Sequence, residues 1–253
     1  MIELRNITKR FGDREVLSGV SGTFKRGITN MIIGASGTGK SVLLKNIVGL
    51  IVPDNGEILF DGRDFVTASK ADRKDIRQEI GMLFQGSALF DSKTVEENVR
   101  FPLDMLTEMP LDAKMDRVNF CLKRVGLETA AKKKPSEISG GMKKRVGIAR
   151  AIVLESNRYL FCDEPNSGLD PRTSTLIDQL IQEITAEYDI TTVVVSHDMN
   201  SVMEIGEYIM FLHNGKKVWE GNHETLLESD QPALNDFLFC NKMMRKFRST
   251  TGH

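Results

Sequence analysis

The octapeptide GASGTGKS at residues 34–41 limits the fold more than any other stretch of the chain. It matches the pattern G-x-x-x-x-G-K-[ST], whose glycines let the backbone turn tightly so that N–H groups point inward to phosphate. An apolar run at residues 28–33 precedes it, and apolar residues at helical spacing follow at residues 41–50. A strand, a loop and a helix in this order predict a nucleotide-binding α/β fold. The alternative is a glycine-rich turn that carries an ordinary surface lysine.

The residue types of this loop suit a nucleoside triphosphate. Lys40 is expected to reach the β- and γ-phosphates, and the Ser41 hydroxyl to bind Mg²⁺. A guanine-reading pattern is missing, because its nearest match at residues 241–244 has methionine in place of the discriminating carboxylate, so ATP is favoured. Phe11 is expected to stack on the adenine, with core packing as the alternative. The predicted nucleotide contacts of this region are Phe11, Gly34, Ala35, Ser36, Gly37, Thr38, Gly39, Lys40, Ser41 and Val42.

Strand-like and helix-like segments alternate through the rest of the chain. Apolar runs at residues 57–60, 158–162, 191–195 and 208–213 predict strands, and Asn214-Gly215 predicts a hairpin turn. This alternation implies a mostly parallel sheet covered by helices. By contrast, the stretch from about residue 86 to 156 has apolar residues at helical spacing and predicts a helical lobe.

Composition excludes several classes of protein. The 253 residues carry a formal net charge of −1, so no basic field indicates nucleic-acid binding. Three widely spaced cysteines favour a reducing compartment over a disulfide framework or a zinc site. No apolar run is long enough to span a membrane, and the first residues lack the pattern of a signal peptide. If the protein acts at a membrane, a partner must place it there.

Two further motifs carry charge chemistry. The strand at residues 158–162 runs into Asp163 and Glu164. Beside a phosphate loop, Asp163 is expected to hold Mg²⁺ through water, and Glu164 to act as general base on the attacking water. Ser139, Gly140 and Gly141 then open a basic helix, and a helix start of this kind can bind an anion. Each motif alone is more often a solvated loop or a plain helix cap.

Six motifs in this order resemble the ATPase subunit of ABC transporters. They are GASGTGKS, Gln85 after residues 82–84, ISGGMKKR, the strand into Asp163-Glu164, the stretch at residues 167–170, and Ser196-His197-Asp198. The resemblance covers residues 1–222 and implies a P-loop NTPase fold of the ABC type: a mostly parallel core, an antiparallel β-subdomain and the helical lobe. It leaves residues 223–253 as a C-terminal extension, in which a basic cluster at residues 242–248 is a membrane contact, a partner contact or a solvated end.

The resemblance also implies roles for single residues. Two chains would pack head to tail, so that Ser139, Gly140 and Gly141 contact the nucleotide held by the partner's phosphate loop. Gln85 would sense Mg²⁺ and the attacking water, His197 would support the γ-phosphate, and Asp170 would cross the dimer interface. The implied catalytic residues are Gln85, Glu164 and His197, and the implied Mg²⁺ ligands are Ser41, Gln85 and Asp163.

Some positions depart from the usual family pattern. Ile138 stands for leucine and Met142 for glutamine in the signature, and Val42 stands for threonine. None of these replaces a phosphate-binding glycine, Lys40, Asp163 or Glu164, so we expect activity to survive.

Three stretches narrow the resemblance to the ATPases of Mla/Mce-type phospholipid transporters. They are GKSVLLKNIVGL, FQGSALFDSKTVEENVRFPL and SGGMKKRVGIARAI. This implies a membrane permease, an Mce-type substrate-binding protein, no nucleic acid, and a peripheral place on the cytoplasmic face of the inner membrane. The alternatives are an importer of amino acids or metal, a lipoprotein exporter, and a soluble ABC ATPase that works on ribosomes or DNA; the last is disfavoured by a single ATPase unit without a coiled coil.

Overall fold

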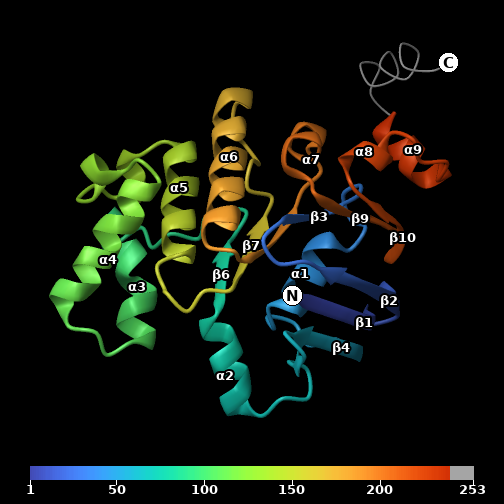
Figure 1. Cartoon of the computed structure of the whole chain (residues 1–253), viewed down its shortest axis with the longest axis horizontal. Coiled ribbons are helices and arrows are strands. Elements are labelled where there is room, and N and C mark those ends of the chain that lie inside the picture. The colour runs from blue at the N-terminus through green and yellow to red at the C-terminus, as the bar shows by residue number, and fades with distance from the viewer. Residues whose placement is uncertain (240–253) are drawn as a thin grey trace. The chain divides into compact units, whose positions relative to one another are not determined.

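The computed structural model describes residues 1–239, which fall into two compact units (Figure 1). Unit 1 comprises residues 1–25, 29–67 and 195–239, and unit 2 comprises residues 26–28 and 68–194. The basic cluster at residues 242–248, the guanine-pattern match at residues 241–244 and Cys240 lie outside the described residues. The predicted boundary at residue 222, between the ATPase domain and the C-terminal extension, does not coincide with the boundaries of these two units, and it stays a prediction.

Unit 1 has an antiparallel sheet and a separate set of three strands. The antiparallel sheet has the order β2-β1-β4-β5, formed by β1 (Ile2–Phe11), β2 (Arg14–Phe24), β4 (Asn55–Phe60) and β5 (Arg63–Asp64). In the other set, β3 (Thr29–Ile33) pairs in parallel with β9 (Tyr208–His213), which forms a hairpin with β10 (Lys216–Gly221). Both residues of the predicted turn, Asn214 and Gly215, have positive φ, as a two-residue hairpin of this type requires.

Four helices complete unit 1: α1 (Lys40–Ile47), α7 (Met199–Ile205), α8 (His223–Leu226) and α9 (Pro232–Leu238). The first of them follows the phosphate loop directly and buries Leu43, Leu44 and Ile47. The last two belong to the predicted C-terminal extension. That segment is attached to the unit, because the Phe237 ring lies 5.4 Å from the Phe211 ring of β9.

Unit 2 has a three-stranded part with the order β8-β7-β6, formed by β6 (Ile80–Leu83), β7 (Tyr159–Asp163) and β8 (Thr191–Val195), whose last residue is assigned to unit 1. Strands β6 and β7 are parallel, and Leu83 pairs with Cys162 at their carboxyl ends. The helices are α2 (Lys70–Gln78), α3 (Val95–Leu106), α4 (Leu111–Arg124), α5 (Gly140–Ala151) and α6 (Pro171–Glu187), with 3₁₀ turns η1 (Glu128–Ala130) and η2 (Pro135–Glu137).

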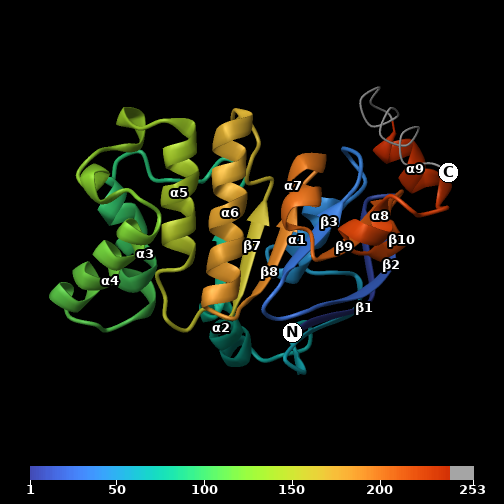
Figure 2. The ribbon, with the colours of Figure 1, turned by 45° about the horizontal axis from the view of Figure 1, so that its top comes forward.

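Helix α5 is the centre of unit 2. It packs against α3, α4, α6 and β6, and Figures 1 and 2 both show it beside α6. Its inner face is apolar, with Val146 and Ile148 fully buried. At its carboxyl end, Arg117 of α4 donates to the Ile152 and Val153 carbonyls at 2.9 Å each, which satisfies acceptors that a helix end leaves open.

The architecture confirms the predicted fold class, an α/β core with an antiparallel sheet and helices. The sequence did not predict α2, α7, α8 or α9. Within residues 1–239, no helix has both the length and the apolar character that crossing a bilayer requires.

Candidate nucleotide site and signature helix

The phosphate loop of unit 1 joins β3 to α1. Lys40 opens the helix and is 6% exposed, and its Nζ donates to the Gly34 carbonyl at 2.8 Å and the Ala35 carbonyl at 3.0 Å. The Thr38 hydroxyl donates to the same Ala35 carbonyl at 2.9 Å. Gly39 precedes the helix at φ 103°, a backbone angle that L side chains avoid. The loop therefore curls around an ammonium at a helix N-terminus, an arrangement that suits a phosphate.

His197 and Phe11 lie in the same unit as this loop. The Ser196 amide donates to the carbonyl of Ile32 in β3 at 3.2 Å, which brings the exposed His197 to the edge where β3 enters the phosphate loop. Phe11 ends β1 and is 49% exposed, with the Lys9 Nζ 5.5 Å from the centre of its ring. The ring is therefore outside the core, where a base could stack on it.

Unit 2 holds the acidic pair. Asp163, the last residue of β7, is 6% exposed, whereas Glu164 is half-buried and has φ 49°. Because β6 and β7 are parallel and Leu83 pairs with Cys162, the exposed Gln85 leaves the sheet at the same edge as Glu164. The structure thus brings Gln85 to the same sheet edge as the adjacent Asp163 and Glu164, which are far from Gln85 in the sequence.

The signature glycines and Asp170 also meet within unit 2. Ser139 caps α5, because its Oγ accepts from the Met142 amide at 3.3 Å, and Gly140 beside it is exposed. Asp170 caps α6, accepting from the Thr173 amide at 3.0 Å and the Thr173 hydroxyl at 2.6 Å, and these hydrogen bonds lower its pKa. A Cβ at Gly141 would lie 2.5 Å from the Thr173 methyl carbon. The two helix starts are therefore in direct contact, and a side chain at position 141 would force Thr173 to move.

Two basic residues of α5 were missed as site residues. Lys144, 4% exposed, donates to the carbonyls of Gln85 and of Glu164, the latter at 3.1 Å. Burial lowers its pKa, against the raising effect of Cys162, Glu164 and Asp163. Arg150 donates to the Ser87 carbonyl at 2.6 Å and the Ala88 carbonyl at 2.7 Å. The sequence carries no signal for either contact, because the partners of both cations are main-chain carbonyls far away in the chain.

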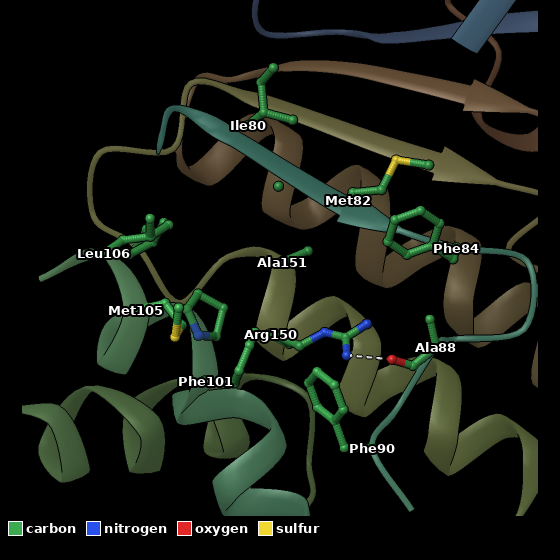
Figure 3. Close-up of a pocket in the computed structure, with 13 residues that line it drawn as sticks. Ile80, Met82, Phe84, Ala88, Phe90, Phe101, Met105, Leu106, Arg150 and Ala151 are labelled. Carbon is green, nitrogen blue, oxygen red and sulfur yellow. Dashed lines mark hydrogen bonds between the residues drawn. The ribbon is translucent and has the colours of Figure 1, made fainter. Parts of the chain in front are cut away.

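An apolar groove of about 620 Å³ opens between β6, α3 and α5 (Figure 3). Its only charged lining residue is Arg150, whose guanidinium points to the Ala88 carbonyl. The Phe90 and Phe101 rings lie 4.7 Å apart in it, and Phe90 is held by Asn98, which bonds its amide at 2.7 Å and its carbonyl at 3.1 Å. The groove is lined by Ile80, Gly81, Met82, Phe84, Ala88, Phe90, Phe101, Pro102, Met105, Leu106, Arg150, Ala151 and Leu154.

The predicted site residues thus form one group in each unit. Phe11, residues 34–42 and His197 belong to unit 1. Gln85, Ser139, Gly140, Gly141, Asp163, Glu164 and Asp170 belong to unit 2. The phosphate-binding set and the carboxylate set are therefore carried by different units.

Sequence comparison finds the same family along most of the chain. The family model described as ABC transporter matches residues 17–167. The chain is 40% identical over 237 residues to the probable ribonucleotide transport ATP-binding protein mkl of Mycobacterium leprae, covering 94% of this chain and 68% of that protein. It is 39% identical over 238 residues to the intermembrane phospholipid transport system ATP-binding protein MlaF of Haemophilus influenzae, covering 94% and 90%.

Solved structures agree with the sequence comparison. A dimeric ATP-binding cassette in a post-hydrolysis state, bound to ADP and Pi, aligns with a TM-score of 0.80 and 34% identity, covering 88% of this chain and 99% of that one. Another is cbiO1 from Clostridium perfringens, part of the ABC transporter complex cbiONQ, with a TM-score of 0.83, 29% identity and 98% of each chain covered. Together with the phosphate loop, the acidic pair and the signature helix, these likenesses show that the chain belongs to the ABC transporter family, as an ATP-binding subunit.

Proposed function

We propose that this chain hydrolyses ATP in a head-to-tail dimer and thereby drives a membrane permease for phospholipid. The observation that carries the proposal is the pair of abutting helix starts in unit 2. Ser139 and Gly140 are exposed at the start of α5, next to the exposed Asp170 at the start of α6. An exposed helix start attracts an anion, and the phosphate loop already serves the chain's own nucleotide. A second chain supplies the anion for the signature.

The proposed chemistry divides between the two residue sets. Lys40 and the backbone of residues 34–42 hold the phosphates, and Phe11 stacks on the adenine. Glu164 accepts a proton from the attacking water, whose oxygen forms a bond to the γ-phosphorus as the bond to the ADP oxygen breaks. Gln85 orients that water, and His197 donates a hydrogen bond to the γ-phosphate. Asp170 and the Ser139–Gly141 segment act across the dimer.

The residues present fit Mg²⁺. Asp163, Gln85 and the Ser41 hydroxyl offer hard oxygen donors, and Asp163 is a buried carboxylate at the same sheet edge as Gln85. Mg²⁺ usually keeps waters and substrate phosphate oxygens among its ligands, so it needs only one or two oxygen donors from the protein. When bound, Mg²⁺ neutralises charge that develops on the phosphates.

The groove between β6, α3 and α5 is the proposed permease contact. It begins at Phe84 and Ala88, on either side of Gln85, so an occupant lies close to a residue of the proposed catalytic set. Its lining is apolar, which suits the apolar face of a short helix. A permease loop seated there would hold the chain at the cytoplasmic face of the inner membrane. The phospholipid cargo and an Mce-type partner protein are inferred from MlaF and from the sequence resemblance.

One purification tests the cargo. The chain is purified with its membrane partners in mild detergent, and the lipid bound to the complex is identified by mass spectrometry. We expect an Mce-type protein, a permease and phospholipid above the level of a mock preparation. Amino-acid, metal or lipoprotein cargo would instead support one of the alternative transporters, and ribosomal or DNA partners would support the non-transport ATPase.

The groove is tested separately by placing a charge in it. Phe90→Glu combined with Met105→Glu should reduce the co-purified permease by about tenfold, because an unpaired carboxylate is costly in an apolar contact. ATP binding by the purified chain should be unchanged. The control is Val52→Glu, which replaces a residue of unit 1 that is 61% exposed and lies outside the groove. Full recovery of permease with the groove variant would contradict the docking proposal.

A further inference from the structure

The side chain of Lys144 joins the two loops that carry the proposed catalytic residues of unit 2. Its Nζ donates to the main-chain carbonyls of Gln85 and Glu164 from within the interior, where the residue is only 4% exposed. We infer that Lys144 is a positioning residue that fixes the spacing between Gln85 and Glu164. This inference rests on the proposed function, because the function is what gives those two residues their roles.

The local backbone explains why such a contact is needed. Glu164 has φ 49°, in the left-handed region that residues with a Cβ seldom adopt. Its carbonyl accepts from the Ser167 amide at 3.2 Å as well as from Lys144. A strained conformation persists when surrounding contacts determine it. Lys144 is one of those contacts, and it holds the backbone from which the Glu164 carboxylate extends.

The Gln85 side of the contact is held in a similar way. Residues 87 and 88 also have positive φ, at 61° and 45°, and Arg150 donates to both of their carbonyls. Helix α5 therefore binds the segment after β6 at two points, six residues apart along the helix. Of the two cations, only Lys144 also contacts Glu164. Loss of its side chain would therefore change the distance between the Gln85 and Glu164 loops, while Arg150 would still hold the segment after β6 on α5.

The arrangement is more than general stabilisation of the fold. Both acceptors of Lys144 are carbonyls of proposed catalytic residues, not carboxylates that an ion pair would use. The phosphate loop and Phe11, which carry the proposed ATP affinity, belong to unit 1, whereas Lys144 and both of its acceptors belong to unit 2. Removing the ammonium should therefore slow the chemical step and leave nucleotide binding nearly unchanged.

The test compares steady-state ATP hydrolysis by full-length variants. Lys144→Met removes the donor and keeps an unbranched side chain. We expect kcat to fall by about tenfold or more while KM for Mg·ATP stays within about twofold, the pattern of a lost transition-state interaction. Lys144→Arg, which keeps donors for both carbonyls, should recover at least about a third of the parent kcat. Lys123→Met, at an exposed position of α4, is the matched control and should behave as the parent.

A double-mutant cycle separates positioning from simple stability. In a Gln85→Ala background, Lys144→Met should lower kcat by less than about threefold, because part of what Lys144 positions is already gone. Thermal melting is recorded for every variant, and Lys144→Gln replaces Lys144→Met if that variant does not fold. An unchanged kcat, an additive cycle, or a parallel loss of kcat, ATP affinity and melting temperature in all Lys144 variants would each overturn the inference. A parent chain without ATPase activity, or Glu164→Gln with parental activity, would refute the proposed function instead.

Discussion

Individual site residues are fixed mainly by backbone partners. Lys40 bonds the carbonyls of Gly34 and Ala35, Lys144 bonds two carbonyls near the acidic pair, and Ser139 accepts from a backbone amide. Such contacts depend on the path of the main chain, and they set the position of the backbone from which side chains such as Glu164 extend. A substitution at any of these positions therefore tests geometry as well as charge.

Lys40→Met should weaken binding of ATP by about tenfold or more, because a charge-assisted hydrogen bond to phosphate is worth roughly 1.5–3 kcal/mol. The measurement is calorimetric titration of the purified variant with Mg·ATP. A melting curve without nucleotide shows whether the variant is folded. Affinity equal to that of the parent would contradict the assignment of Lys40 to the phosphates.

Gly141→Ala should disturb the contact between the α5 and α6 starts, since its Cβ would lie 2.5 Å from the Thr173 methyl carbon. We expect a loss of about 1–3 kcal/mol in the free energy of unfolding, typical of an overpacked contact, with reduced ATPase activity. Thr173→Ser removes that methyl group and keeps the hydroxyl that bonds Asp170. The double variant should therefore regain part of both losses in urea titration and ATPase assays, and no regain would show that the clash is not the cause.

At the scale of secondary-structure elements, α5 is the element on which the proposed site depends. One end carries the signature serine, its middle carries Lys144, and its last turn carries Arg150. Arg117 of α4 satisfies carbonyls just beyond the other end. Because a helix moves as a rigid body, a shift of α5 would change the distances in all of these contacts together.

Arg117→Met should lower the free energy of unfolding by about 1–3 kcal/mol, because two carbonyls lose a charged donor. The effect belongs to the end of α5 that is remote from the signature. ATP affinity should therefore change little. Urea unfolding of Arg117→Met and of the exposed control Lys123→Met makes the comparison, and equal stability of the two would contradict the capping role.

The sequence predicts elements where the chemistry is local. Three local sequence patterns predict the structure found at the same residues: GASGTGKS predicts a phosphate loop, Asn214-Gly215 a hairpin turn, and the apolar run before Asp163 a strand. Glycine, asparagine and aspartate mark these places because they suit the backbone angles or the charge that each structure needs. Helix α2 was missed because only Ile76 of its nine residues is buried, so it has no apolar period. The roles of Lys144 and Arg150 could not be predicted, since their partners are carbonyls far away in the sequence. The groove likewise arises from three elements that only the fold brings together.

The whole molecule is proposed to work as a dimer, so its mass should respond to nucleotide. Glu164→Gln is expected to bind ATP without turning it over and to accumulate the closed dimer. Light scattering with chromatography should give a monomer mass without nucleotide and twice that mass with Mg·ATP.

A second variant controls for the signature contact. Ser139→Arg in the Glu164→Gln background places a bulky cation at the exposed start of α5 and should keep the monomer mass with Mg·ATP. Glu164→Gln that stays monomeric with ATP, or a Ser139→Arg dimer, would count against the shared site.

The groove beside β6 also affects how the chain behaves when it is made alone. Met105 is 66% exposed, Leu106 40% and Phe90 39%, so several large apolar side chains meet water on one surface. Uncovered apolar surface of this kind promotes self-association. Overproduced without its proposed permease partner, the chain should aggregate at high concentration, and co-expression with that partner should raise its yield.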